Sequence, residues 1–316
     1  MDRFQLVKNA YDRSTFLTPE NPAYYERVKA LVLQFYHEDL GEQGDITSKA
    51  LEIEHQSSAA QIISKAEGII AGLTELKIFY DELKLKYRFY KRDGDKIYPK
   101  DLIVRLEGSM SVLLSSERTA LNLIQRMSGI ATLTNKFVEL YSPLGIAATR
   151  KTHWGLLDKK AVSVGGGLTH RLGLCDAILI KENHLRSLSS TQKESTLKIA
   201  LTRAWKFMST KTFIEIEVET VNEAFEAANT INELKTASPE MTTPCIIMFD
   251  DMSPEQINEV ITGLKNQKIY NKILFEASGG IKEGIIDAYR DCGVDVISMG
   301  RLTHSPESLD LSQLFC

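Results

Sequence analysis

The sequence predicts an α/β protein in two parts, a mixed N-terminal part and a parallel sheet flanked by helices. After residue 145, short β-rich runs alternate with helical stretches, which is typical of a parallel sheet, either open or closed into a barrel. The preceding residues mix helical and strand patterns without that alternation. A chain of 316 residues, 43% of them hydrophobic, suffices for one large or two medium domains.

The N-terminal part has an α+β pattern. Residues 21–40 have helical periodicity, and residues 58–73 predict a strand, a turn and the start of a helix. Residues 87–108 alternate in polarity and are interrupted by Asp-Gly and Pro, so they predict strands and turns. Residues 115–140 are apolar at helical spacing and predict one or two helices.

The C-terminal part contains six strand candidates. They lie at residues 145–150, 175–180, 213–218, 245–249, 273–277 and 295–298. Helical patterns separate most of them, at residues 196–208, 221–234, 254–265 and 282–292. Before the third of these helices, Ser253 and Gln256 form a capping-box pattern, with Pro254 at the first helical position.

The composition excludes several classes of protein. A formal net charge of −4 is unlike the basic excess of a general nucleic-acid-binding protein. No apolar run approaches the ~18 residues that span a bilayer, and the N-terminus lacks the apolar region of a secretory signal. The four cysteines form no CxxC pair and are expected to be buried thiols. We therefore expect a cytoplasmic protein with no nucleic-acid or membrane partner.

Polar residues recur where each expected strand ends. They are Arg150 and Lys151, Lys181, Glu217 and Glu219, Asp250 and Asp251, Ser278 to Gly280, and Gly300 with Arg301. In a parallel barrel the carboxyl ends of all strands meet at one mouth, where such folds place their sites. A purely structural barrel needs only turn formers there, so six polar ends predict a functional site.

The expected mouth carries groups of both charges. The cationic ones are Arg150, Lys151, His170, Arg171 and Lys181, and the acidic ones are Glu217, Glu219 and Asp250. Arginine binds carboxylate or phosphate through two parallel hydrogen bonds, while carboxylate oxygens bind Mg²⁺ together with substrate phosphates. The mixture predicts a polyanionic ligand accompanied by a divalent metal.

Two glycine clusters are candidates for phosphate binding. Gly165 to Gly167 precede His170, and Ser278, Gly279 and Gly280 are expected to begin a helix. Glycine lets backbone N–H groups approach a phosphate, and a helix N-terminus favours its charge. An ordinary turn is the alternative for either cluster taken alone.

Several of these residues have a structural alternative. His170 is equally compatible with a structural histidine, and Asn183 and His184 are expected to cap or orient the loop after the second strand. Trp154 lies just past the first strand end, where we expect it to pack at the rim of the site rather than stack on the ligand.

Three carboxylates of the third strand present a similar choice. Glu215, Glu217 and Glu219 alternate with apolar residues, so they face one side of the strand. That arrangement is unfavourable unless a cation or a metal shares the side. An exposed edge strand is the alternative.

Longer motifs occur in a fixed order along the chain. They are GDITS, AEGIIAG, ERTALNLIQRMSGIATLT, ATRKT, GGGLTHRLGLCDAILIKENH, IEIEVET, FDDM, FEASGGI and GVDVISMGRLTHS. Through them, from about residue 25 to its end, the chain resembles the quinolinate phosphoribosyltransferases, also called carboxylating nicotinate-nucleotide pyrophosphorylases.

The resemblance implies a fold and a reaction. It implies an N-terminal α/β sandwich over residues 1–120, an incomplete α/β barrel over residues 121–302, and a C-terminal tail, 303–316, that returns to the first domain. The family forms a homodimer or higher homo-oligomer, in which one subunit's sandwich covers another's barrel mouth. The implied enzyme is a pentosyltransferase. It converts quinolinate and phosphoribosyl pyrophosphate, with Mg²⁺, to nicotinate mononucleotide, CO₂ and pyrophosphate in NAD biosynthesis.

The resemblance also implies roles for individual residues. Arg118 matches an arginine lent across the subunit interface to the carboxylates of quinolinate. The basic pocket corresponds to Arg150, Lys151, His170 and Arg171, and Lys181 matches a lysine near the substrates. Glu217 and Asp250 match the acids that face the ribose and the metal, and with Lys151 they are the expected catalytic residues. Phosphate is expected at Ser278, Gly279, Gly280 and Gly300, and His304 lies in the loop after the last strand.

One loop departs from the family pattern, which usually has TTPGLR where this chain has THWGLL. His153 and Trp154 stand for Thr and Pro, Leu157 replaces an arginine, and the connection is about two residues shorter. Two alternatives stay open. One is a paralogous phosphoribosyltransferase or pyrophosphorylase acting on another acceptor. The other is a non-catalytic binding protein of the same fold, against which the retained cations and acids argue.

Overall fold

The computed structural model describes residues 2–53, 56–188, 195–207, 213–281 and 283–316. The chain divides into two compact units, each built from three segments. The parallel-sheet unit comprises Met1–Arg13, Phe137–Arg150 and Leu168–Gly300, and the antiparallel-sheet unit comprises Ser14–Lys136, Lys151–Gly167 and Arg301–Cys316. The units therefore do not follow a single boundary after residue 120.

Six parallel strands form the sheet of the first unit. They are β6 (Gly145–Ala147), β7 (Ile178–Ile180), β8 (Ile214–Val218), β9 (Cys245–Asp250), β10 (Leu274–Ser278) and β11 (Val296–Ser298). Their order is β6-β11-β10-β9-β8-β7, and every neighbouring pair is parallel. Each expected strand is present, and the predicted α/β fold class is confirmed. The chain has this parallel sheet and a separate antiparallel sheet.

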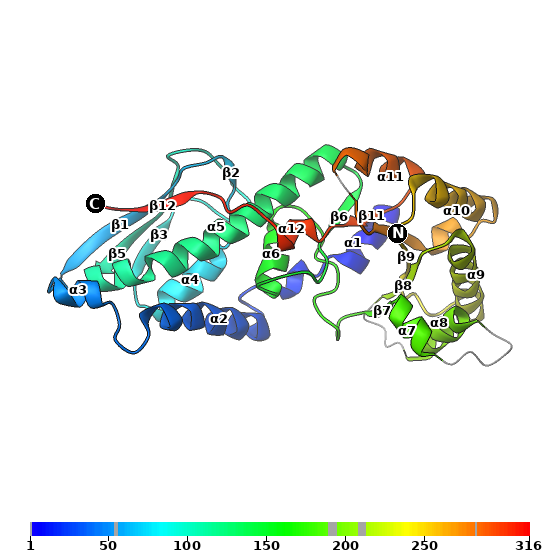
Figure 1. Cartoon of the computed structure of the whole chain (residues 1–316), viewed down its shortest axis with the longest axis horizontal. Helices are drawn as coiled ribbons and strands as arrows, with labels where there is room; N and C mark the ends of the chain where they lie inside the picture. The colour runs from blue at the N-terminus through cyan, green and yellow to red at the C-terminus, as the bar shows by residue number, and fades with distance from the viewer. Residues whose placement is uncertain (1, 54–55, 189–194, 208–212, 282) are drawn as a thin grey trace. The chain divides into compact units, whose positions relative to one another are not determined.

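Helices connect these strands and run along the outside of the sheet (Figure 1). They are α8 (Thr196–Phe207), α9 (Val221–Ala237), α10 (Pro254–Asn266) and α11 (Ile286–Cys292), with the short α7 (Glu182–Ser187) after β7. The predicted capping box of α10 is confirmed, because Ser253 and Gln256 each accept the other's backbone N–H. These reciprocal bonds satisfy donors that the helix itself leaves unpaired, so the start of α10 is specified locally.

Helix α1 (Arg3–Tyr11) packs against the starts of the parallel strands. Its buried residues Val7, Ala10 and Tyr11 share one core cluster with Ala177, Phe213, Ile246, Leu274 and Val296. Arg3 donates to the Asp295 carboxylate at 2.5 and 2.7 Å and lies 3.9 Å from the ring centre of Tyr270. No pattern predicted this helix. The available signal was Asp2, whose carboxylate caps it by accepting the Gln5 N–H.

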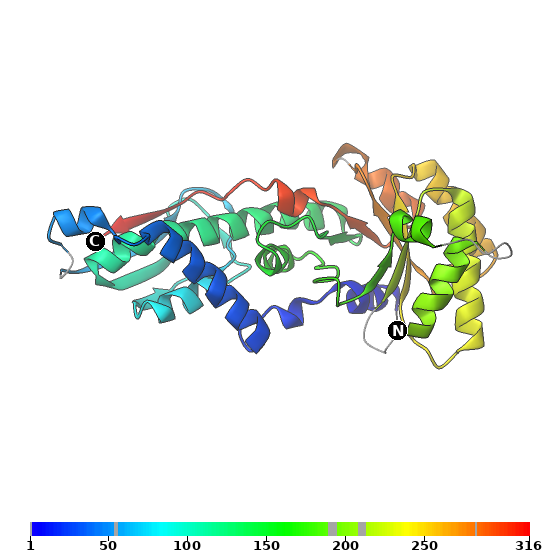
Figure 2. The same ribbon diagram turned by 60° about the horizontal axis from the view of Figure 1, so that its bottom comes forward.

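The second unit is built on a four-stranded antiparallel sheet of order β12-β1-β5-β3. Its strands are β1 (Ser57–Ser64), β3 (Lys86–Phe89), β5 (Leu102–Ser109) and β12 (Leu311–Phe315), and β2 (Gly68–Ile69) pairs with β4 (Lys96–Ile97). Figure 2 shows α2 (Pro22–Leu40), α4 (Leu73–Glu82) and α5 (Met110–Tyr141) running alongside this sheet. The shorter helices are α3 (Ile46–Ala50), α6 (Leu156–Val164) and α12 (Arg301–His304).

The C-terminal segment joins this sheet, since β12 pairs with β1. Helix α5 holds the segment in place. Gln125 accepts the Leu309 N–H at 3.0 Å and donates its side-chain N–H to the Leu311 carbonyl at 2.8 Å. One turn later, a Cβ added to Gly129 would lie 1.9 Å from the Glu307 carbonyl oxygen, so glycine is required for this close approach.

The cysteines only partly match the expected buried thiols. Cys245 and Cys292 are buried, but Cys175 and Cys316 are exposed, so the expectation is wrong for these two. Cys175 is exposed because β7 begins only at Ile178, leaving it in the preceding turn. None of the described helices is long and apolar enough to cross a bilayer.

Glu75, a buried carboxyl of the antiparallel-sheet unit, is expected to make stability depend on pH. Its Oε1 accepts the Tyr24 hydroxyl at 2.7 Å. Burial, and then the charge of Asp93, raise the pKa of Glu75 to about 7 from an ordinary 4.5. Between these values the folded chain retains a proton that the unfolded chain has lost. This group therefore lowers the free energy of unfolding as pH rises through that window.

Glu75→Gln is expected to remove this pH dependence. The free energy of unfolding would otherwise fall by at most about 3 kcal/mol across the window. Urea unfolding at pH 5 and pH 8 measures it, with Glu38→Gln on the exposed face of α2 as the control. Equal pH slopes for the wild type and Glu75→Gln would contradict the assignment.

Candidate active site

Polar residues lie at the carboxyl edge of the parallel sheet. Arg150 follows β6, Lys181 follows β7, Glu217 lies near the end of β8, Asp250 ends β9, Ser278 ends β10 and Gly300 follows β11. The strands are parallel, so these ends share one edge, as the pattern predicted. Ser278 and Asp250 are partners in the β9–β10 register.

Lys181 and Glu217 form an ion pair at this edge. Lys181 Nζ donates to Glu217 Oε1 at 2.5 Å, and the carboxylate is 12% exposed. The backbone N–H of Lys181 is bound by Nδ1 of His184 at 2.9 Å, which confirms that His184 orients the loop after β7. The pair therefore presents a carboxylate and an ammonium group held in one place by two neighbouring strands.

Arg150 and Arg171 bring two guanidinium groups near each other. Arg171 is buried, and its Nη1 donates to the Ala177 carbonyl at 3.2 Å. Burial, and then the charge of Arg150, lower the pKa of Arg171, while Glu215 and Glu217 act in the opposite direction. Two like charges held together in a partly desolvated place favour binding of an anion, and guanidinium suits carboxylate or phosphate.

The β9 and β10 ends make a tight backbone junction. The Asp251 N–H donates to the Ser278 carbonyl at 3.0 Å, and Ser298 Oγ donates to Ser278 Oγ at 3.1 Å. Gly279 has a φ of 85°, and a Cβ there would lie 2.9 Å from Asp250 Oδ1 and 2.7 Å from the Asp251 nitrogen. The junction therefore needs glycine. It does not begin a helix as predicted, because the next helical turn is a 3-10 turn at Glu283–Ile285, followed by α11 from Ile286.

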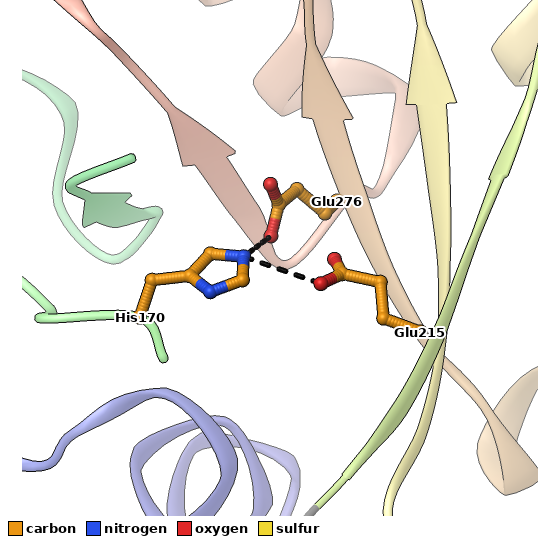
Figure 3. A group of neighbouring side chains, drawn as sticks. All are labelled: His170, Glu215 and Glu276. Atoms are coloured by element: carbon orange, nitrogen blue, oxygen red, sulfur yellow. Dashed lines mark ion pairs between the residues drawn. The ribbon is translucent and has the colours of Figure 1, made fainter. Parts of the chain in front are cut away.

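His170 lies inside the parallel-sheet unit, between two buried carboxyls (Figure 3). Its Nε2 is 3.3 Å from Oε2 of Glu215, on β8, and 3.3 Å from Oε2 of Glu276, on β10. The three side chains are 6%, 0% and 0% exposed. Glu215 therefore shares its side of β8 with a histidine, and the exposed-edge interpretation of this strand is wrong because β8 lies inside the sheet.

The hydrogen bonds of His170 determine where the protons of this cluster lie. Burial lowers the pKa of His170, but the charges of Glu215 and Glu276 raise it to about 9, which favours a charged ring. Nδ1, however, accepts the backbone N–H of Arg171 at 2.7 Å, which a ring protonated on both nitrogens could not do, so the hydrogen bond favours the neutral ring with its proton on Nε2. Two ionised carboxylates beside a neutral ring would repel each other, so one of them holds a proton. Burial, and then the charge of Glu276, raise the pKa of Glu215 to about 7, in agreement with this count.

The same cluster is the one group of metal-ligand type found in the described residues, with ligand atoms within 4.8 Å of one another. A metal on Nε2 requires the ring proton to sit on Nδ1. The Arg171 N–H occupies that position, so the cluster is not a metal site.

Lys151 belongs to the antiparallel-sheet unit, in a loop organised by the buried Asp158. The Asp158 carboxylate accepts hydrogen bonds from Nε and Nη2 of Arg126, both at 2.9 Å. It also accepts the backbone N–H groups of His153 and Trp154, at 2.9 and 3.1 Å. Four donors on one carboxylate fix the turn formed by THWG, the stretch that departs from the family pattern.

Arg126 also connects this turn to α12. Its Nη2 donates to the Thr303 carbonyl at 3.0 Å, and Thr303 Oγ1 donates to the Lys151 carbonyl at 2.7 Å. The Trp154 ring lies 5.3 Å from the Phe35 ring and 5.2 Å from the Arg126 guanidinium. Trp154 therefore packs within its own unit.

Of the other predicted residues, Gly280 and the exposed Glu219 lie in the parallel-sheet unit, and Arg118, His304 and Gly165 lie in the antiparallel-sheet unit. Arg118, on α5, is 65% exposed beside Glu117, and His304 is exposed beside Ser305. Gly165 ends α6, and a Cβ there would lie 2.4 Å from the Ala131 carbonyl, so packing against α5 requires this glycine.

Sequence patterns missed four residues that support the site. They are Tyr11, Arg126, Asp158 and Glu276. Glu276 had the clearest signal, since it is a carboxylate inside an otherwise apolar buried strand. Arg126 and Asp158 lie on helical patterns where charged residues are ordinary, so no local signal distinguishes them.

The chain matches known families and proteins over most of its length. Residues 130–313 match the profile of the quinolinate phosphoribosyl transferase C-terminal domain, and residues 45–128 match that of the N-terminal domain. A probable nicotinate-nucleotide pyrophosphorylase (carboxylating) of Bacillus subtilis is 37% identical over 292 residues, covering 90% of this chain and 92% of the relative. A quinolinate phosphoribosyltransferase (decarboxylating) 1 of Nicotiana glauca is 32% identical over 317 residues, covering 97% and 87%.

A solved structure has the same fold. The nicotinate-nucleotide pyrophosphorylase of Francisella tularensis aligns with a TM-score of 0.77 at 32% identity, covering 92% of this chain and 97% of that one. The N-terminal and C-terminal domain matches follow each other along the chain, and together they cover nearly all described elements from β1 to β12. The chain therefore belongs to the quinolinate phosphoribosyltransferase family.

Proposed function

We propose that this protein transfers the phosphoribosyl group of phosphoribosyl pyrophosphate to quinolinate, with loss of CO₂. The products are nicotinate mononucleotide and pyrophosphate, in NAD biosynthesis. The observation that carries the proposal is the Arg150–Arg171 pair beside the Lys181–Glu217 ion pair, on one edge of a parallel sheet. A dicarboxylate acceptor matches the two guanidinium groups, and a developing cation matches the neighbouring acids.

The acceptor is held through its carboxylates. Arg150 and Arg171 bind them with charge-assisted hydrogen bonds, and Lys181 adds a positive charge at the same edge. Family resemblance supports the same task for Lys151 and Arg118. Selection of quinolinate over nicotinate then depends on the contacts of the 2-carboxylate, because nicotinate lacks that group.

The reaction forms two bonds and breaks two. The pyridine nitrogen attacks the anomeric carbon as the bond to pyrophosphate breaks, so positive charge develops on the ribose. Glu217 and Asp250 stabilise that charge from the ends of β8 and β9. The bond between C2 and its carboxylate then breaks, and CO₂ leaves. Its electron pair stays at C2, next to the cationic nitrogen, until C2 takes up a proton.

Magnesium fits the acids at this edge. Glu217 and Asp250 offer hard carboxylate oxygens, and the glycine at position 279 keeps the space beside Asp250 Oδ1 open. Proteins usually hold this ion with one or two carboxylates alongside substrate phosphates. When bound, Mg²⁺ supplies neutralisation of the leaving pyrophosphate. We propose Ser278, Gly279, Gly280 and Gly300 as the backbone that contacts phosphate.

We also propose a cytoplasmic homodimer or larger homo-oligomer, with Arg118 lent to a second copy. The 65% exposure of Arg118 supports this role, since an arginine that reaches another subunit must project from its own.

The direct test is turnover by the purified protein with Mg²⁺, phosphoribosyl pyrophosphate and either quinolinate or nicotinate. Quinolinate is expected to be consumed, with CO₂ and pyrophosphate released in equal amounts, and Lys151→Ala is expected to abolish most of the rate. If nicotinate reacts and quinolinate does not, the protein is a phosphoribosyltransferase for another acceptor. The altered loop at His153 and Trp154 is the reason to consider that alternative first. Absence of both turnover and binding would favour a non-catalytic protein.

A further inference from the structure

The buried cluster of Glu215, His170 and Glu276 does not take part in the steps described above. Both carboxyls are fully buried and lie within β8 and β10, before the carboxyl ends of these strands. Burying ionisable groups is unfavourable unless they are paired, so an apolar trio would be the simpler core. The contacts of the imidazole indicate what the cluster does.

The imidazole is held from three elements. Nε2 faces the carboxyls of Glu215 and Glu276, which lie on strands separated by β9. The Tyr11 ring of α1 meets it edge-on at 5.3 Å, and the Phe213 ring meets it edge-on at 5.5 Å. A ring with these neighbours has one orientation available.

The backbone at His170 is in the left-handed region, with a φ of 53°. Residues other than glycine adopt it rarely, and it persists only where the surroundings impose it. The preceding residue is anchored as well, since Thr169 Oγ1 accepts the Arg13 N–H at 2.8 Å and donates to the Tyr11 carbonyl at 3.0 Å. The turn that introduces Arg171 is thus imposed by α1, β8 and β10.

The imidazole is bonded directly to the next residue. Nδ1 accepts the Arg171 N–H at 2.7 Å, so the ring position determines where the Arg171 backbone lies. The Arg171 guanidinium is bonded in turn to the Ala177 carbonyl, directly before β7. Displacing the ring therefore displaces an arginine proposed to bind the acceptor.

We propose that Glu215, His170 and Glu276 form a positioning cluster that places Arg171 for the carboxylates of the acceptor without touching the acceptor. The inference rests on the proposed function for the identity of that acceptor. The placement of Arg171 by the cluster does not depend on which acceptor is bound.

Two variants of Glu276 separate positioning from mere burial. Glu276→Gln keeps an oxygen that accepts the Nε2–H, whereas Glu276→Met has similar length and no acceptor. We expect Glu276→Met to raise KM for quinolinate by about tenfold or more, because misplacing a binding group by ~1 Å costs up to about 100-fold. KM for phosphoribosyl pyrophosphate is expected to stay unchanged, and Glu276→Gln is expected to restore most of the loss.

Glu75→Met is the matched control, since Glu75 is a fully buried glutamate of the other unit. It also removes a buried carboxyl but is expected to leave KM for quinolinate unaltered. His170→Asn is a second test, because asparagine tolerates the left-handed backbone but has no Nε2. It is expected to raise KM for quinolinate as Glu276→Met does.

Hydrogen exchange of the Arg171 amide tests the cluster without any substrate. The amide is expected to exchange faster in Glu276→Met than in the wild type and Glu276→Gln, while protection in β8 and β10 is kept. Unchanged exchange would overturn the proposal, as would faster exchange with an unaltered KM for quinolinate. If the wild type turns over no quinolinate, the proposed function fails, while exchange still decides whether Glu276 places Arg171.

Discussion

Replacing Glu217 by glutamine is expected to lower kcat/KM for quinolinate phosphoribosylation by about 100- to 1,000-fold, the usual effect of removing one electrostatic stabiliser. Glutamine keeps the shape of the side chain and an oxygen for the Lys181 ammonium, which now lies at 2.5 Å from the carboxylate. The negative charge that faces the developing cation is lost. The loss is expected mainly in kcat, because the charge on the ribose exists only in the transition state.

The matched control is Glu219→Gln. Glu219 follows two residues later with the same alternation, but it is exposed and lies beyond the end of β8. It is expected to change kcat/KM by no more than a few-fold. Steady-state kinetics measure kcat/KM for each variant, and circular dichroism checks that each variant is folded. Equal losses in both variants would mean that general negative charge, not the Glu217 carboxylate, matters.

Replacing Asp158 by asparagine is expected to destabilise the antiparallel-sheet unit by about 3–5 kcal/mol, the effect of breaking a buried ion pair. The carboxylate is fully buried and accepts four N–H donors, two of them from Arg126. The amide has one acceptor oxygen, so the charge of the half-buried Arg126 would be left partly unpaired. Urea unfolding followed by far-ultraviolet circular dichroism measures the change.

The double variant Arg126→Met with Asp158→Leu distinguishes an unpaired charge from lost packing. Replacing both partners of a buried pair by apolar residues is often neutral or stabilising, so much of the stability is expected to return. Activity is not expected to return, because the turn that carries Lys151 loses both its Asp158 cap and its link through Thr303. A double variant less stable than Asp158→Asn would contradict the ion-pair explanation.

Local patterns were sufficient for most of the secondary structure. The six strands of the parallel sheet are mostly apolar runs with polar ends, apart from Glu215 in β8 and Glu276 in β10, and the boundaries of α10 follow from Ser253, Pro254 and Gln256. The pattern over residues 115–140 allowed one or two helices, and α5 is one helix of 32 residues. Such features depend on neighbours in sequence, so the sequence alone reveals them.

One prediction failed and one helix was missed where local patterns are ambiguous. Ser278, Gly279 and Gly280 were expected to begin a helix, but glycines permit several backbone conformations, and here the approach of Gly279 and Gly280 to Asp250 and Asp251 decides between them. Helix α1 has nine residues and a weak apolar face, so packing on the strand starts specifies it more than periodicity does.

The sequence by itself determined the alternation of strands and helices, the polar strand ends and the family. It also placed Arg150, Lys181, Glu217 and Asp250 on one edge, since parallel strands share their direction. Only the tertiary structure decided that His170 lies between Glu215 and Glu276, and that Arg126 and Asp158 hold the turn after Lys151. Each of those contacts joins residues far apart in the chain. Such contacts depend on strand order and packing, which the local spacing of residues does not encode.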